Sequence, residues 1–287
     1  MKILFIGGGN MSFAIISGLI YNKHSIFVID PLPDARKKIL KLSKKTHSMS
    51  TVEVFDNLNE FSKKNIIPSW SILSVKPQQI NSINFEIKET KPTFIAKSPL
   101  ISIVAGLSIR TLKKITKNSQ IIRAMPNTPA LIKMGITGYY ATKNVSLKTQ
   151  NQATKILSQI GEVVKLPSET MIDTITAISG SGPGYTFKFI SAIEKAAINS
   201  GLPKVFLRKF IYTTLIGSVQ LWDKSGENSE DLMHKVASKG GTTEEALNHL
   251  DTGNFDNLII KAVEKAKKKS EYLSLEINKQ VDEHSNK

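Results

Sequence analysis

The chain has 287 residues, and 40% of them are hydrophobic, which suffices for a substantial core and for two domains of ordinary size. It contains no cysteine, so disulfides, a thiolate nucleophile and a cysteine-ligated metal are excluded. Its net charge of +15 comes from lysines spread along the whole chain, without a zinc-finger, helix-turn-helix or RNA-binding motif. We therefore expect no nucleic-acid partner.

Two further absences narrow the class of protein. The histidines show no spacing typical of a metal site, so we expect no transition metal; they are His24, His47, His234, His249 and His284. No segment has the length of a membrane span, and the apolar run Ile3 to Ile6 is too short for a signal peptide. We expect a cytoplasmic protein without membrane contact.

The first part of the chain alternates short β-branched runs with helical patterns. Strands are predicted at residues 2–6, 26–29, 70–75, 101–105 and 121–125, with further strands at 135–142 and 162–166. Helices are predicted between them, among others at residues 11–21, 33–42 and 107–114. The alternation predicts an α/β domain with a mostly parallel, doubly wound sheet, and the last two strands are expected at its edge.

After Pro167 the strand patterns give way to helical ones. Helices are predicted at residues 169–177, 183–200, 203–223, 229–237, 243–250 and 255–276. We expect a dinucleotide-binding (Rossmann) domain over 1–166, an all-α domain over 167–277 and a polar, frayed tail over 278–287.

A glycine-rich loop joins the first predicted strand to the first helix. Gly7 permits a tight turn there, and Gly9 lets the backbone approach a pyrophosphate. The third position of the dinucleotide fingerprint is Ser12, which is small enough for contact between helix and strand. The loop predicts a cofactor site that includes Ile6, Gly7, Gly8, Gly9, Asn10 and Met11.

Other strand ends should contribute to the same crevice. Asp30 ends the second strand, where an acidic residue typically binds the ribose hydroxyls of NADH and repels a 2′-phosphate. Arg36, Lys37 and Lys38 follow closely, so NADPH remains an alternative, and Asp30 could instead be a turn residue before Pro31. The later strand ends add Ser74, Val75, Lys76, Pro77, Ala105 and Gly106.

A second loop has the features of an anion site. Residues 235–247 read K-V-A-S-K-G-G-T-T-E-E-A-L, a flexible segment that leads into a helix. The free N–H groups of a helix N-terminus and the positive end of its dipole favour a small anion. Two such loops, far apart in sequence, suggest that a cofactor and a carboxylate substrate are brought face to face. The alternative is an ordinary Ser/Thr helix cap.

Five motifs in chain order carry a family resemblance. They are Ile6 to Met11, Val75-Lys76-Pro77, the run Ile121 to Ala130 (I-I-R-A-M-P-N-T-P-A), Ser179 to Pro183 and Gly240 to Thr243. Together they resemble pyrroline-5-carboxylate reductase from residue 1 to about 275. The run around Arg123 and the Gly-Gly-Thr-Thr loop are specific; Gly-x-Gly alone is not.

The resemblance implies the last step of proline synthesis. A hydride from NADPH or NADH reduces the C=N bond of 1-pyrroline-5-carboxylate to give L-proline. The protonated imine is already a good electrophile, so holding two reactants in line is the main task, which is worth up to roughly 7–11 kcal/mol. The resemblance also implies a homodimer formed through the helical domain, often assembled further into a pentamer of dimers.

The resemblance assigns roles within the second loop. The expected substrate-binding residues are Gly240, Gly241, Thr242 and Thr243, and the backbone amides of Gly241, Thr242 and Thr243 are expected to hold the carboxylate. The resemblance gives the catalytic contacts to Ser238, whose side chain also binds the carboxylate, and to Thr243, whose hydroxyl meets the ring nitrogen. Lys239 departs from the family, which usually has proline there, so a looser loop and a higher KM are expected.

Some assignments stay open. Arg123 is expected to pair structurally, while Asn127 could bind substrate or brace a rigid turn. Either Asn57 or Asn59 could be the asparagine that the family places near the adenosine.

Two rival functions make different demands on the sequence. A β-hydroxyacid dehydrogenase would carry a catalytic lysine where Thr186 stands, with Lys188 two residues further on. A non-catalytic nucleotide-binding or nucleic-acid-binding protein would not need the second loop.

Overall fold

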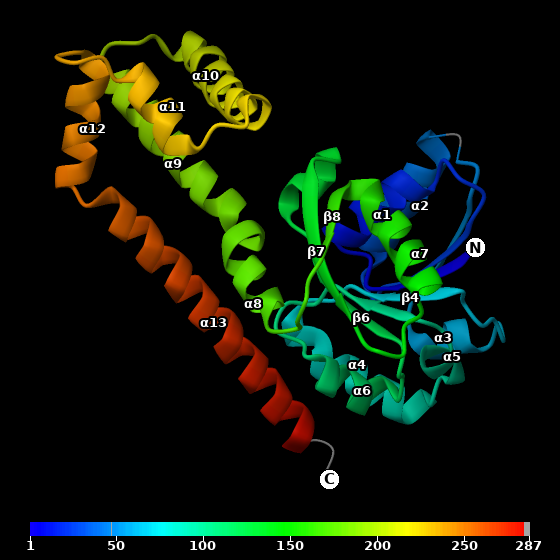
Figure 1. The fold of residues 1–287 in the computed structure, drawn as a ribbon. Coiled ribbons are helices and arrows are strands. Elements are labelled where there is room, and N and C mark those ends of the chain that lie inside the picture. Colours follow the sequence, from blue (N-terminus) through cyan, green and yellow to red (C-terminus); the bar gives the residue numbers. More distant parts are fainter. Residues whose placement is uncertain (47, 284–287) are drawn as a thin grey trace. The chain divides into compact units, whose positions relative to one another are not determined.

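The computed structural model describes residues 1–46 and 48–283, and its strands form one eight-stranded sheet (Figure 1). The strand order is β3-β2-β1-β4-β5-β6-β7-β8, and every pairing is parallel except that of β6 with β7. The strands are β1 (Lys2–Ile6), β2 (Ser25–Ile29), β3 (Thr51–Phe55), β4 (Trp70–Leu73), β5 (Leu100–Ser102), β6 (Ile121–Met125), β7 (Gly135–Ala141) and β8 (Gly161–Lys165). The predicted doubly wound sheet, with its two added edge strands, is confirmed.

Helices connect the strands and then make up the second part of the chain (Figure 1). Those that accompany the sheet are α1 (Asn10–Leu19), α2 (Pro33–Lys45), α3 (Leu58–Ser62), α4 (Ile80–Thr90), α5 (Thr93–Lys97), α6 (Ile109–Thr116), α7 (Leu147–Leu157) and α8 (Met171–Ile175). The later helices are α9 (Gly182–Asn199), α10 (Lys204–Ser225), α11 (Ser229–Val236), α12 (Thr242–Thr252) and α13 (Phe255–Glu283). The predicted all-α character of this second part is confirmed.

Alternation along β1 shows how the sheet builds a core on each face. Ile3 and Phe5 pack with α1 and α7 on one face, whereas Leu4 and Ile6 pack with α3, α5 and α6 on the other. Successive side chains of a strand point to opposite faces, so a strand covered on both sides must be apolar throughout. This is why the first strand reads as an unbroken apolar run.

The chain divides into two compact units. One is Met1–Ser181 together with the chain from Ala266 onward, and the other is Gly182–Lys265. The predicted domain limit at residue 166 marks the change from strands to helices. The first compact unit instead extends to Ser181 and so includes α8. Contacts of α8 explain the difference, because Asp173 pairs with Arg123 of β6 and accepts a hydrogen bond from Ser270 of α13.

The structure adds one strand and corrects two predicted elements. Strand β3 had no predicted range. The helix predicted at 169–177 is a short α8 followed by a π-helical turn at Thr176–Gly180. The tail predicted from residue 278 is wrong as far as Glu283, since α13 continues and buries Ile277 and Val281 against the sheet unit. Residues 284–287 of that tail lie outside the described residues.

One glycine at the sheet edge is fixed by its surroundings. Gly161 has a φ of +133°, and a Cβ built there would lie 1.9 Å from the carbonyl oxygen of Gly135. We expect Gly161→Ala to lower the free energy of unfolding by at least about 2 kcal/mol, because that backbone conformation is almost restricted to glycine. Urea unfolding measures it, with Gly184→Ala, which adds a Cβ in open space, as the control. Equal stability of Gly161→Ala and the wild type would contradict this expectation.

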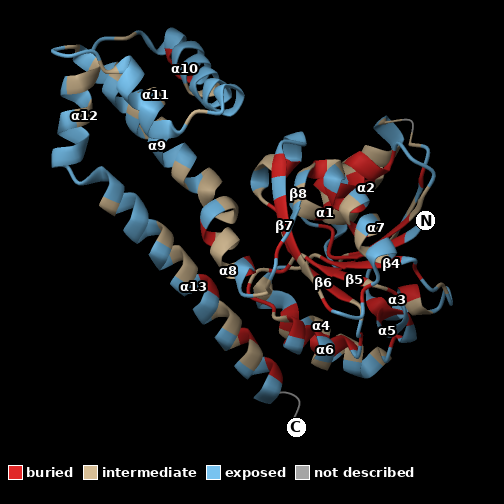
Figure 2. Cartoon of the chain, viewed as in Figure 1, coloured by how far each residue is buried: buried red, intermediate tan, exposed pale blue. Residues whose placement is uncertain are grey.

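Burial differs sharply between the two units (Figure 2). The sheet unit holds nearly all of the buried apolar residues, whereas α9 and α12 contain no buried residue. Helix α10 buries only Leu207 and Ile211 among its 22 residues. The exposed apolar side chains of the second unit include Phe187, Phe206, Phe210, Trp222 and Leu258.

The described residues contain neither a helix that could span a membrane nor a cluster of metal ligands. Within residues 1–46 and 48–283, no helix is long and apolar enough to cross a bilayer. The same part of the chain contains no group of three His, Cys, Asp or Glu side chains placed to hold a metal ion. His47 and His284 lie outside it.

Candidate functional site

The first glycine loop lies where β1 passes into α1. Gly7 has a φ of +103°, and a Cβ built on it would lie 2.5 Å from the carbonyl oxygen of Ser74 at the end of β4. Gly9 is the N-cap of α1, and nothing lies within 4 Å of a Cβ built there. The loop is therefore tight on its inner side and open on its outer side, as the approach of a pyrophosphate to the helix N-terminus requires.

The buried hydroxyl of Ser12 holds this loop against the neighbouring strand end. Its Oγ donates to the carbonyl oxygen of Gly7 at 2.6 Å and lies 2.7 Å from the Ser74 hydroxyl. Ser12 is fully buried. The third fingerprint position thus uses a small polar residue to join the β1 and β4 ends, where glycine would leave no such bond.

Asp30 fixes the loop from the other side. Its Oδ2 accepts a hydrogen bond from the N–H of Gly8 at 2.7 Å, and its Oδ1 accepts one from the N–H of Leu32 at 2.9 Å. Both carboxylate oxygens are therefore oriented before any ligand arrives, and lone pairs remain for hydroxyl donors. Asp30 is both a turn residue and a part of the crevice wall.

A hollow of about 290 Å³ opens at the carboxyl ends of the first strands. Among the described residues, its lining is Ile6, Gly7, Ile29, Asp30, Pro31, Asp56, Asn57, Val75, Gln79, Ser82, Ile83 and Glu86. In open α/β sheets, ligands bind at this edge of the strands. The structure therefore brings four of the predicted cofactor residues together, and places Asn57, rather than Asn59, in the same hollow.

The sequence missed the part of this hollow contributed by β3 and α4. Asp56 follows β3 directly, and Glu86 projects from α4 to accept a hydrogen bond from the N–H of Leu58 at 2.5 Å. The alternating run Thr51 to Phe55 could have revealed β3 and thereby its acidic end.

Three other predicted cofactor residues have different surroundings. Lys76 is exposed, and its backbone N–H donates to the Gln79 side chain at 2.9 Å. Gly106 has a φ of +74°, and a Cβ there would lie 3.3 Å from Ile277 of α13. Ala105 is half-buried. Their roles in cofactor binding stay predictions.

The second glycine loop joins α11 to α12. Gly240 has a φ of +71°, and a Cβ on Gly241 would lie 2.6 Å from the Ser238 hydroxyl. Within the loop, the N–H of Gly241 donates to the Ser238 carbonyl oxygen at 2.9 Å, and the N–H of Gly240 donates to Glu244 Oε2 at 2.6 Å. Both glycines are therefore required by the bend itself.

The start of α12 leaves hydrogen-bonding groups open. Gly241 is its N-cap and offers no side chain, and neither Thr242 nor Thr243 makes a hydrogen bond through its N–H or hydroxyl to the described residues outside the helix. The first turn of a helix has N–H groups that only a cap, water or a ligand can satisfy. Thr242 and Thr243 thus carry donors of this loop that remain for an anion.

Arg123 has a structural environment, as predicted. Its guanidinium is 3% exposed and pairs with Glu169 at 3.1 Å and Asp173 at 3.3 Å. Asn127 is also engaged at both ends, because its Oδ1 accepts from the N–H of Ile136 and its Nδ2 donates to the Ser179 carbonyl oxygen. These contacts favour the bracing role for Asn127.

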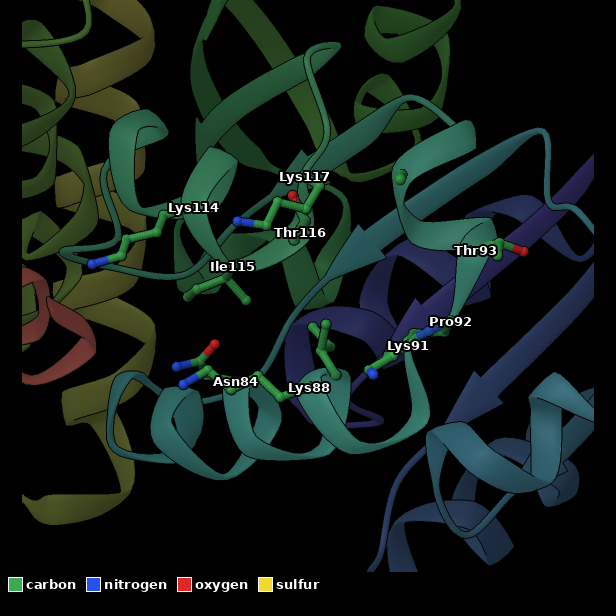
Figure 3. A pocket seen from close by; sticks show the side chains of 11 residues that line it. Asn84, Lys88, Lys91, Pro92, Thr93, Lys114, Ile115, Thr116 and Lys117 are labelled. Atoms are coloured by element: carbon green, nitrogen blue, oxygen red, sulfur yellow. The ribbon is translucent and has the colours of Figure 1, made fainter. Parts of the chain in front are cut away.

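A larger hollow of about 620 Å³ lies on the other side of α4 (Figure 3). Lys88 and Lys91 at the end of α4 face Lys114 and Lys117 at the end of α6 across it, and the Lys114 ammonium pairs with Asp282 at 2.6 Å. Lysines at helix C-termini complement the helix dipole. This hollow is separate from the glycine loops.

Comparisons with known proteins match this organisation. A family model described as pyrroline-5-carboxylate reductase dimerisation matches residues 169–273, and one described as NADP oxidoreductase coenzyme F420-dependent matches residues 2–106. The chain is 33% identical to pyrroline-5-carboxylate reductase 2 of Bacillus subtilis over 94% of both chains. It is 34% identical to the Synechocystis reductase over 95% of this chain and 98% of that one.

Solved structures agree with the sequence comparisons. The pyrroline-5-carboxylate reductase of Coxiella burnetii superposes with a TM-score of 0.80 at 31% identity, over 95% of this chain and 98% of that one. The Plasmodium falciparum enzyme, solved with NADP bound, gives 0.79 at 27% identity, over 96% and 98%.

Proposed function

The chain belongs to the pyrroline-5-carboxylate reductase family, and from this premise we propose how its two glycine loops divide the reaction. It is an NAD(P)H-dependent oxidoreductase that reduces 1-pyrroline-5-carboxylate to L-proline in proline biosynthesis. The observation that carries this conclusion is similarity to such reductases over nearly the whole of both chains. A β-hydroxyacid dehydrogenase is not favoured, since Thr186 lacks an amine and its hydroxyl donates within α9 to Gly182.

We assign the dinucleotide to residues 1–166 and to the crevice formed by Gly7, Gly9 and Asp30. The tight contact of Gly7 with Ser74 and the open outer side of Gly9 fit a pyrophosphate. The bound cofactor supplies the hydride. The remaining proposed contacts are Ile6, Gly8, Asn10, Met11, Ser74, Val75, Lys76, Pro77, Ala105 and Gly106.

We assign the substrate to the loop before α12, in the helical part 167–277. The N–H groups of Thr242 and Thr243 lack acceptors among the described residues outside the helix and lie at the positive end of the helix dipole, which supports a role in carboxylate binding. Gly240 and Gly241 shape the bend. The proposed catalytic contacts are the Thr243 hydroxyl with the ring nitrogen and Ser238 with the carboxylate.

The assembly is a homo-oligomer, in keeping with the dimerisation model that matches residues 169–273. We propose that α9 to α12 form the contact within a homodimer, because they expose many large apolar side chains. A pentamer of dimers and a cytoplasmic location are the finer proposals.

The assay of this function follows the absorbance of NADH or NADPH with and without 1-pyrroline-5-carboxylate. We expect oxidation of the nicotinamide only when the imino acid is present, and formation of L-proline in equal amount. Turnover of 3-hydroxyisobutyrate in place of the imino acid would favour the dehydrogenase, and no turnover at all would favour a binding protein.

Cofactor choice gives a direct test of Asp30. We expect Asp30→Ser to shift the ratio of kcat/KM values towards NADPH, because the variant lacks the carboxylate that repels a 2′-phosphate. Asp34→Ser, which removes a fully exposed carboxylate from the same segment, is the matched control. An unchanged ratio in Asp30→Ser would leave Asp30 as a turn residue only.

A further inference from the structure

We propose that Asp56 is a second determinant of cofactor choice, which acts by neutralising Arg36. Without Asp56, the Arg36 guanidinium would be free to bind a 2′-phosphate. The ion pair between the two residues therefore disfavours NADPH. The proposal deepens the assigned function, because it takes the hollow beside Asp30 as the adenosine end of the cofactor site. Asp56 is a positioning residue in this scheme, because it keeps the Arg36 guanidinium from binding the 2′-phosphate.

The Arg36 guanidinium spans the ends of two strands. Its Nη2 lies 2.8 Å from Asp56 Oδ1 after β3, and its Nη1 donates to the Asp30 carbonyl oxygen at 2.6 Å after β2. Its side chain is only 15% exposed. Two bonds in different directions fix the guanidinium plane and engage both of its terminal nitrogens.

The hollow beside this pair has an acidic wall. Its lining within the described part of the chain includes three carboxylates, those of Asp30, Asp56 and Glu86, and contains no lysine or arginine. Ribose hydroxyls can donate hydrogen bonds to carboxylates, whereas a phosphate dianion offers acceptors and like charge. The wall therefore suits a ribose with a free 2′-hydroxyl.

The other two cations of the segment point to different partners. The Lys37 ammonium lies 4.0 Å from Asp34. The Lys38 ammonium donates to Asn10 Oδ1 at 3.1 Å and lies 4.5 Å from the centre of the Phe13 ring. Of these three cations, Arg36 is thus the one that bonds to residues lining the hollow, Asp30 and Asp56. Asp56 is the residue that neutralises its charge.

The test measures binding of two nucleotide fragments to Asp56→Asn by calorimetry. We expect the affinity for 2′,5′-ADP to rise about tenfold and that for 5′-ADP to change less than about twofold, since the released Arg36 guanidinium can then bind the 2′-phosphate. A purely structural role of Asp56 would move both ligands together. Asp56→Ser, measured in parallel, removes the same charge with a shorter side chain.

Two further variants isolate the route through Arg36. In an Arg36→Gln background, Asp56→Asn should no longer raise the affinity for 2′,5′-ADP. Glu53→Gln is the matched control, because Glu53 lies in β3, three residues before Asp56, in an exposed pair with Lys64 at 3.0 Å, and the change should leave both affinities unchanged.

Several outcomes overturn the proposal. They are equal changes for both fragments, no change for 2′,5′-ADP, or a gain that persists without Arg36. If Asp56→Asn lowers the melting temperature, the comparison of the two fragments still decides, because loss of folded protein affects both alike. The fragments bind without the imino acid, so failure here is distinguishable from failure of the reductase assignment, which the turnover assay tests.

Discussion

Replacing Thr243 with alanine is expected to lower kcat/KM for 1-pyrroline-5-carboxylate by one to two orders of magnitude. The Thr243 hydroxyl makes no hydrogen bond to the described residues, and α12 is capped by Gly241 without a side-chain bond. Its removal should therefore leave the loop intact. A lost hydrogen bond to a polar group of the reacting molecule costs about 1–3 kcal/mol.

The neighbouring threonine provides a matched control. Thr242→Ala keeps the backbone N–H that we assign to the carboxylate and removes only an exposed hydroxyl, so kcat/KM should change less than about threefold. Steady-state kinetics at saturating cofactor compare the two variants. Equal melting temperatures show that both are folded. If Thr243→Ala retains wild-type kcat/KM, the hydroxyl has no part in the reaction.

Replacing Arg123 with methionine is expected to lower the free energy of unfolding by about 3–5 kcal/mol, the usual cost of removing one partner from a buried ion pair. Arg123 is 3% exposed and lies between Glu169 and Asp173. Methionine keeps much of the length of the arginine side chain. The loss of unfolding free energy therefore reflects the lost charge more than a lost side-chain volume. Chemical unfolding followed by circular dichroism measures it.

The carboxylates left behind provide the check on this explanation. The triple variant Arg123→Met, Glu169→Gln, Asp173→Asn removes the unpaired charges and should recover a large part of the lost stability. Below its melting temperature, Arg123→Met should keep its KM for the imino acid. A stable Arg123→Met protein with a strongly raised KM would instead make Arg123 a substrate ligand.

The parts of the fold that the sequence predicted are those with unbroken patterns. The run Lys2 to Ile6 is apolar because both faces of β1 are covered, and Gly7 follows because a Cβ would collide with Ser74. Local sequence therefore predicts the tight turn of the first glycine loop well. It also predicts the bend at Gly240, where positive φ and glycine coincide.

Features that depend on partners distant in sequence were missed. Strand β3 alternates polar with apolar residues and is not a continuous apolar run, so neither that strand nor the acidic end at Asp56 was recognised. Polar residues around Asn278 hid the continuation of α13, although Ile277 and Val281 repeat at helical spacing and are buried by the sheet unit. The ion pair of Arg36 with Asp56 joins helix α2 to the end of β3 and has no local signal in the sequence.

The scarcity of buried residues in α9 to α12 makes the lifetime of this protein depend on its abundance. Helices that bury so little within their own chain gain their stability from association, and association obeys mass action. A dilute solution should therefore lose the helical half before the sheet. In a cell, a newly synthesised copy would be vulnerable to proteases until it meets another.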